Sequence, residues 1–137
     1  MDGKCVFCSM QRSADTKILF SDGLCYVILD KYPETRGHML VISKIHFADM
    51  LSAEDATVAK MFSVAGRAAV ISKKVLGAGG INIGTNVGAI AGQHIMHFHI
   101  HVIPRYSGVT NSDRDKYWKS VSEDEAAALA NLLMQEA

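Results

Sequence analysis

Four of the six histidines of this chain lie within eight residues, from His94 to His101. Three of them, His97, His99 and His101, alternate with apolar residues. Side chains of a β-strand alternate between its two faces, so the three imidazoles are expected on one face. Imidazole titrates near neutral pH and serves in proton transfer, nucleophilic attack and metal binding, whereas a merely solvated strand face usually carries Thr, Lys or Ser. The pattern therefore predicts an enzyme.

The middle histidine of the three is the best-placed nucleophile. A neutral imidazole attacks phosphorus well only when a fixed acceptor holds a proton on one ring nitrogen and the other nitrogen is free. His99 is flanked on the same face by His97 and His101. We therefore expect His99 to form the covalent bond in any group transfer at this site.

The composition is typical of a compact protein with one core. The chain has 137 residues, of which 49% are apolar and 20% charged, and its formal net charge is zero. No basic run favours a nucleic-acid partner, and no segment has the length of a membrane span or the apolar stretch of a signal peptide. The odd set of Cys5, Cys8 and Cys25 is no secreted disulfide framework and favours a reducing, cytoplasmic location.

The elements that must position these histidines can be predicted from periodicity and turn signals. Five strands are expected at Lys17–Phe20, Cys25–Leu29, His38–Ile42, Ile81–Thr85 and Met96–Ile103. A long helix is expected from an N-cap at Ser52 to a stop at Gly77, and a capping box of Ser122 and Glu125 opens a C-terminal helix to about Gln135. This order predicts a single α+β domain with a largely antiparallel sheet, its core at about 5–105 and a helical extension at about 106–137.

The run from His97 to Ile103 resembles the histidine triad (HIT) motif, His-φ-His-φ-His-φ-φ, in which φ is apolar. The likeness also includes Lys17–Phe20, Leu29-Asp30, Gly37–Ile42, His46, Asn86 and Gly92-Gln93. These residues are similar to the Hint-like branch, and the tail from Ile103 to Tyr106 looks more like bacterial and organellar members. The resemblance implies a HIT-like fold and a hydrolase or nucleotidyl transferase. Such proteins cleave purine nucleoside phosphoramidates, adenylates or dinucleoside polyphosphates through a nucleotidyl-histidine intermediate.

The resemblance also assigns roles to histidines and amides. It implies that His97, His99 and His101 form the catalytic triad, with His99 as the nucleophile and His101 as a donor to a phosphate oxygen. His38 would belong to a relay that orients the first or middle histidine of the triad. Gln93 and Asn86 would bind phosphate or bridging oxygens; by themselves, Gln93 could simply cap a strand entry and Asn86 could be a turn residue.

The nucleoside contacts are implied by the resemblance alone. Four apolar positions correspond to residues that sandwich the purine in relatives: Phe7, Met10, Ile28 and Leu29. Asp30 corresponds to the carboxylate that binds the ribose hydroxyls, although periodicity alone is equally consistent with core residues and an ordinary turn Asp. His94 departs from the pattern, because Hint proteins commonly place a leaving-group serine directly after the glutamine. An imidazole there is larger and titratable, so the leaving-group preference is expected to differ.

The N-terminal cysteines have the spacing of a metal knuckle. Thiolates are strong zinc ligands, but Cys5 and Cys8 alone do not close a tetrahedral site. Several bacterial-type triad proteins complete such a site with the equivalents of His46 and His97. The resemblance therefore implies a structural zinc and no organic cofactor; the alternative is a pair of free thiols packed beneath the sheet.

The family implies a homodimer with the long helix and the strand at Ile81–Thr85 near the two-fold axis. The expected buried stripe of this helix comprises Val58, Met61, Phe62, Ala65, Ala68, Ala69 and Ser72. Val64, Val70 and Ile71 lie beside that stripe, so a second face needs covering.

Two other functions remain open from the sequence. The chain could be a non-catalytic nucleotide-binding scaffold, or a metalloenzyme that uses all three triad histidines as ligands. The physiological leaving group is expected at a solvent-facing mouth, near C-terminal residues such as Trp118.

Overall fold

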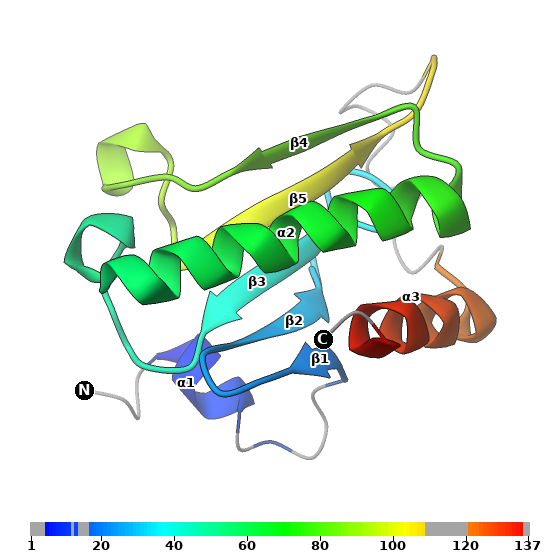
Figure 1. The fold of residues 1–137 in the computed structure, drawn as a ribbon. Helices are drawn as coiled ribbons and strands as arrows, with labels where there is room; N and C mark the ends of the chain where they lie inside the picture. The colour runs from blue at the N-terminus through cyan, green and yellow to red at the C-terminus, as the bar shows by residue number, and fades with distance from the viewer. Residues whose placement is uncertain (1–4, 12, 14–16, 109–120, 136–137) are drawn as a thin grey trace.

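The computed structural model describes residues 5–11, 13, 17–108 and 121–135 (Figure 1). Its strands are β1 (Ile18–Ser21), β2 (Cys25–Leu29), β3 (Met39–Ser43), β4 (Gly80–Gly84) and β5 (His99–Arg105). Its α-helices are α1 (Val6–Met10), α2 (Asp55–Leu76) and α3 (Glu123–Gln135), with 3-10 turns at Met50–Ser52 and Ala89–Ala91. The Trp118 position falls outside the described residues.

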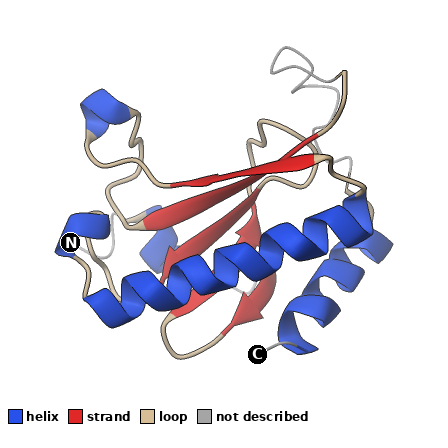
Figure 2. Ribbon diagram, turned by 45° about the horizontal axis from the view of Figure 1, so that its top comes forward, coloured by secondary structure: helices blue, strands red, loops and turns tan. Residues whose placement is uncertain are grey.

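The strands form one antiparallel sheet in the order β1-β2-β3-β5-β4. Figure 2 shows α2 and α3 together on one face of this sheet. Their buried residues form one core with the strand residues that point that way, among them Phe98, Ile100 and Val102. On the other face, Phe7 of α1 packs against Tyr26 and a smaller apolar cluster. The predicted α+β fold with a five-stranded antiparallel sheet is confirmed.

The short helix α1 is absent from the sequence prediction. Its N-cap is Cys5, whose Sγ accepts the backbone N–H of Cys8. The hydroxyl of Tyr26 donates to the carbonyl of Phe7 over 2.6 Å in a buried contact, and burial raises the pKa of Tyr26. The Cys5 cap and the Tyr26 bond, which comes from a distant part of the sequence, hold a short helix that propensity alone would not stabilise.

The long helix starts later than predicted, because Ser52 ends a separate turn. The Asp49 carboxylate accepts from the backbone N–H groups of Leu51 and Ser52. The backbone N–H of Asp49 in turn donates to Ser52 Oγ. This capping box closes the 3-10 turn, and α2 begins at Asp55 without a side-chain cap. The predicted stop is confirmed: Gly77 adopts a left-handed φ of 73°.

The C-terminal helix covers part of the second apolar face of α2. Its predicted capping box is confirmed by reciprocal 3.0 Å bonds between Ser122 and Glu125. Val64 and Ile71 of α2 have no exposed surface and share a core with Leu129 of α3. Contrary to the expectation from the sequence, Val64 and Ile71 need no second chain to cover them. Val70, in contrast, is 51% exposed. None of the helices in the described ranges is long and apolar enough to cross a membrane.

Candidate active site

The triad histidines reach one face of the sheet, but the strand carries only two of them. The sequence pattern placed the start of this strand at Met96, but β5 begins at His99. The strand starts later because the backbone N–H of His97 donates to the carbonyl of Ile95 in a turn. Within β5, His99 lies opposite Ile42 and His101 opposite Leu40 of β3. The pairing with β3 therefore fixes the positions of His99 and His101 in the sheet.

His99 is held in one tautomer. Its Nδ1 lies 2.6 Å from the carbonyl oxygen of His97, which can only accept, so Nδ1 carries the proton. The lone pair is therefore on Nε2. The ring is buried and lines a cavity of about 510 Å³. Burial lowers the pKa of His99, which favours the neutral imidazole that a nucleophile requires.

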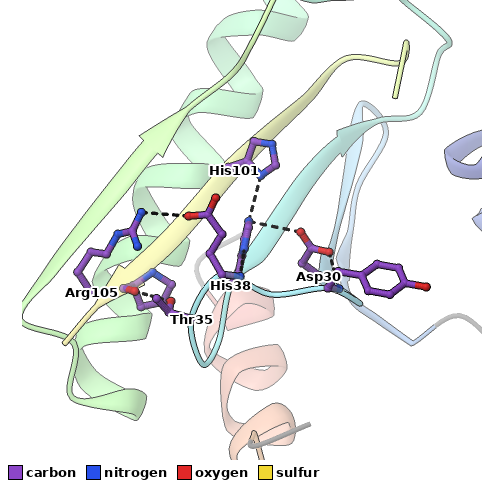
Figure 3. A network of polar contacts seen from close by, with 8 residues as sticks. Asp30, Thr35, His38, His101 and Arg105 are labelled. Atoms are coloured by element: carbon purple, nitrogen blue, oxygen red, sulfur yellow. Dashed lines mark hydrogen bonds and ion pairs between the residues drawn. The ribbon is translucent and has the colours of Figure 1, made fainter. Parts of the chain in front are cut away.

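His101 is held in the opposite tautomer through His38. The backbone N–H of Glu34 donates to His38 Nδ1 over 3.0 Å, so the proton of His38 is on Nε2. That Nε2 lies 3.0 Å from His101 Nδ1 and 3.5 Å from Asp30 Oδ2 (Figure 3). His101 Nδ1 therefore accepts from His38, and the proton of the His101 ring is on Nε2. Burial lowers the pKa of His101 as well. The relay orients the third histidine, not the first or middle one as expected.

His97 has a different position from its neighbours. Its Nε2 donates to the carbonyl of Ser43 over 2.7 Å, and its Nδ1 faces the cysteines of α1. The ring is fully buried and is not among the groups that line the cavity. Its backbone carbonyl accepts from His99 Nδ1. The His97 ring was expected in catalysis, but here it faces the cysteines, and His97 positions His99 through its backbone.

The cavity contains most of the predicted nucleoside contacts. Its lining includes Phe7, Met10, Ile28, Asp30 and His94. Leu29 is the exception, because it packs against the core on the opposite face. Strand alternation requires this result, since adjacent Ile28 and Leu29 cannot face the same side.

The two predicted amides differ from expectation. Gln93 is buried, its Oε1 accepts from Gly88, and its Nε2 donates to the carbonyls of Ala48 and Ile95. These bonds hold the loop that precedes β5, so Gln93 is a structural amide here. Asn86 lines a second, smaller cavity and donates to Gly92 over 3.4 Å.

Several lining residues were missed by the sequence prediction: Val6, Lys31, Tyr32, Glu34, Leu40, Gly92 and Ile95. Three of them belong to the segment between Asp30 and His38. Because both ends of that segment were placed in the site, the residues between them had to pass over it. The sequence therefore already indicated that residues of this segment line the site.

A separate cluster fits a zinc ion. The ligand atoms of Cys5, Cys8, His46 and His97 all lie within 4.8 Å of one another. His97 Nδ1 is 3.1 Å from His46 Nδ1 and 3.2 Å from Cys5 Sγ, and Cys8 Sγ is 3.3 Å from His46 Nδ1. A tetrahedral zinc with bonds of about 2.0–2.3 Å places its ligands about 3.3–3.8 Å apart. Two thiols and two imidazoles at these spacings are a suitable donor set.

The other candidate metal cluster has unsuitable chemistry. Asp30, His38 and His101 also bring ligand atoms within 4.8 Å. However, His38 Nδ1 accepts a backbone N–H, so His38 Nε2 carries a proton and cannot also donate a lone pair to a metal. The geometry likewise gives no support to a metal held by all three triad histidines, because the His97 ring is turned to the cysteines.

Comparisons with known proteins agree with this geometry. The HIT domain family model matches residues 11–108. The chain belongs to the histidine triad family.

Relatives of this family resemble the chain over most of its length. It is 36% identical over 123 residues to adenylylsulfatase HINT3 of Arabidopsis thaliana, a match that covers 89% of this chain and 59% of that protein. It is also similar to a crystal structure of a zinc-bound histidine triad family protein from Mycobacterium smegmatis (TM-score 0.83, 34% identity, 99% and 97% of the two chains). A hypothetical histidine triad nucleotide-binding protein from Sulfolobus tokodaii gives a TM-score of 0.79 at 30% identity, with 96% and 93% covered.

Proposed function

We propose that the chain is a nucleotide-binding hydrolase or nucleotidyl transferase that acts on purine nucleoside phosphoramidates, adenylates or dinucleoside polyphosphates. The opposite tautomers of His99 and His101 carry this proposal. The hydrogen bonds leave a lone pair on His99 Nε2 and a proton on His101 Nε2. The two rings are adjacent, with centroids 5.0 Å apart. A nucleophile beside a proton donor is the arrangement that covalent group transfer requires.

In the first step, His99 Nε2 attacks the α-phosphorus of a bound nucleotide. As the nitrogen–phosphorus bond forms, the bond from phosphorus to the leaving group breaks and the electron pair departs with that group. His101 donates a hydrogen bond from Nε2 to a phosphate or bridging oxygen, and an amine leaving group takes its proton from water. In the second step, water attacks the same phosphorus, its proton passes to solvent, and the electron pair of the nitrogen–phosphorus bond returns to His99 Nε2.

The remaining proposed roles concern nucleoside binding. Phe7, Met10 and Ile28 provide the apolar wall for the purine, and the Asp30 carboxylate can accept from two ribose hydroxyls. His38 and the carbonyl of His97 position the reacting histidines. His94 is exposed and lines the same cavity, where it can contact the bound substrate.

Zinc would be held by Cys5, Cys8, His46 and His97 and would supply structural cross-linking alone, because four protein ligands leave no open position. It would fasten α1, which carries Phe7 and Met10, to the residue that orients His99. We also propose a homodimer that uses α2 and β4. The Val70 side chain, 51% exposed, and the Ile83 side chain, 42% exposed, are available for that contact.

A substrate panel tests the proposed function. Purified protein is given AMP-lysine, AMP-tryptamine, ADP and diadenosine polyphosphates, and AMP binding is measured in parallel. Turnover of at least one adenylate or phosphoramidate, retained after zinc removal at a temperature where the fold persists, is the expected result. AMP binding without turnover of any compound would replace the enzyme with a nucleotide-binding scaffold.

A further inference from the structure

A second cavity lies beside the first on the histidine side of the sheet. It has a volume of about 300 Å³, and its lining includes Asn82, Asn86 and Arg105. Glu34 and His101 line both cavities. Because β4 pairs with β5 on the side away from β3, this second cavity extends from His101 toward the β4 edge. His101 therefore lies between the cavity proposed for the nucleoside and this second cavity.

The proposed reaction requires room on this side of His101. The first cavity is lined by α1, β2 and the segment that follows β2, so the nucleoside lies on the β2 side of the histidines. In a phosphoryl or nucleotidyl transfer, the attacking and leaving atoms lie roughly in line on opposite sides of phosphorus. A leaving group that accepts the hydrogen bond of His101 Nε2 extends past that residue. The second cavity begins there.

The guanidinium of Arg105 is fixed at this position. Its Nε donates to Asn82 Oδ1 over 2.7 Å, and its Nη2 lies 3.1 Å from Glu34 Oε2 (Figure 3 draws the ion pair). A guanidinium oriented from two sides is prepared to bind a carboxylate, sulfate or phosphate group through two N–H bonds. The departing group also gains negative charge, which a neighbouring cation stabilises. Glu34 contributes by orienting Arg105.

We propose that the second cavity is the leaving-group subsite, and that Arg105 makes it select leaving groups that carry an oxyanion. This inference rests on the proposed function. Arg105 binds the oxyanion and exchanges no proton or electron pair. The phosphorus–leaving-group bond breaks as the His99 bond forms, an amine takes its proton from water, and a sulfate departs unprotonated.

A matched pair of substrates isolates the oxyanion. The phosphoramidates of AMP with alanine and with ethylamine differ only in the carboxylate. Wild-type protein is expected to show the higher kcat/KM with the alanine compound. Arg105→Gln should lower that value by about ten- to a hundredfold, the effect of a lost bidentate, charge-assisted contact. The ethylamine compound should be affected little. Adenylyl sulfate and diadenosine triphosphate then show whether sulfate or phosphate leaving groups share the loss.

Two further variants distinguish recognition from anchoring. Glu34→Gln removes the ion pair but keeps the Arg105 charge and its bond to Asn82, so the preference for the alanine compound should fall less than in Arg105→Gln. Arg67→Gln is the matched control, because Arg67 lies over the Phe20 ring, on α2, and lines neither cavity. Equal losses on both compounds in Arg105→Gln, or the same profile in Glu34→Gln, would overturn the subsite.

Folding and basal function are checked in the same experiment. Circular dichroism melts verify each variant, and Arg105→Lys, which keeps the charge but loses the fork, should give an intermediate loss on the alanine compound alone. If the wild-type protein cleaves neither compound nor any adenylate, the proposed function fails and this inference fails with it. If it cleaves both compounds without preference, only this inference fails.

Discussion

Replacement of His46 by alanine should separate the metal site from the catalytic site. His46 is the exposed member of the cluster, and the interactions described for its side chain are within that cluster, to Cys8 and His97. The substitution therefore removes one zinc ligand and little packing. His97→Ala would be less informative, because it also empties a fully buried volume and breaks the bond to Ser43.

The size of the effect follows from metal linkage. At free zinc about 1,000 times the dissociation constant, binding stabilises the folded chain by about 4 kcal/mol. For a domain of this length, 1 kcal/mol corresponds to a Tm change of about 3–5 °C. A variant that has lost a ligand and binds zinc weakly should therefore melt about 12–20 °C lower than wild type in the same buffer.

Differential scanning calorimetry with and without a chelator measures this shift, and elemental analysis gives the zinc content. Wild-type protein should carry about one zinc per chain and lose stability on chelation, whereas His46→Ala should respond little to the chelator. His94→Ala is the control: it removes another exposed histidine, which lies outside the cluster. Less than about a tenth of an equivalent of zinc in wild-type protein, or the same Tm in both states, would refute the reasoning.

Three other results are expected. His38→Ala should lower kcat about ten- to a hundredfold while AMP affinity changes little, because it frees the His101 tautomer without touching the purine wall; a kcat equal to wild type would contradict the relay. The pKa of His101 is lowered by burial from the ordinary 6.5, so kcat/KM should be flat above that pH and fall only as the pH drops through a value below it; an acidic limb above 6.5 would count against a neutral donor. Light scattering should show a dimer at micromolar concentration that Ile83→Glu weakens, and a clean wild-type monomer would exclude it.

Much of the fold was predictable because its signals are local. The period of two in the strands, Gly77 and the Ser122 capping box each depend on a few neighbouring residues. Ser52 misled for the same reason: a serine with acidic residues after it is an N-cap signal, and only the presence of Asp49 shows that it closes an earlier turn. Local patterns do not state which of two overlapping turns extends into a helix.

The sequence indicates which histidines gather at the site, but not the hydrogen bonds that fix each imidazole. The triad pattern gave the three histidines, whereas the bonds of His97 to Ser43 and of Glu34 to His38 join segments distant in sequence or depend on loop conformation. The Glu34 bond fixes the tautomer of His38 and, through it, that of His101, and the Ser43 bond fixes the tautomer of His97. The three backbone partners of Gln93 are likewise visible only in the folded loop.

The central claim, that His99 Nε2 is the nucleophile, is tested most directly by trapping the covalent intermediate. A labelled adenylate is mixed with the protein, the reaction is quenched during turnover, and the modified peptide is mapped. The label should be on His99, and His99→Asn should bind AMP normally while turnover falls by several powers of ten. Label on His94, His97 or His101 instead, or full activity in His99→Asn, would contradict the account.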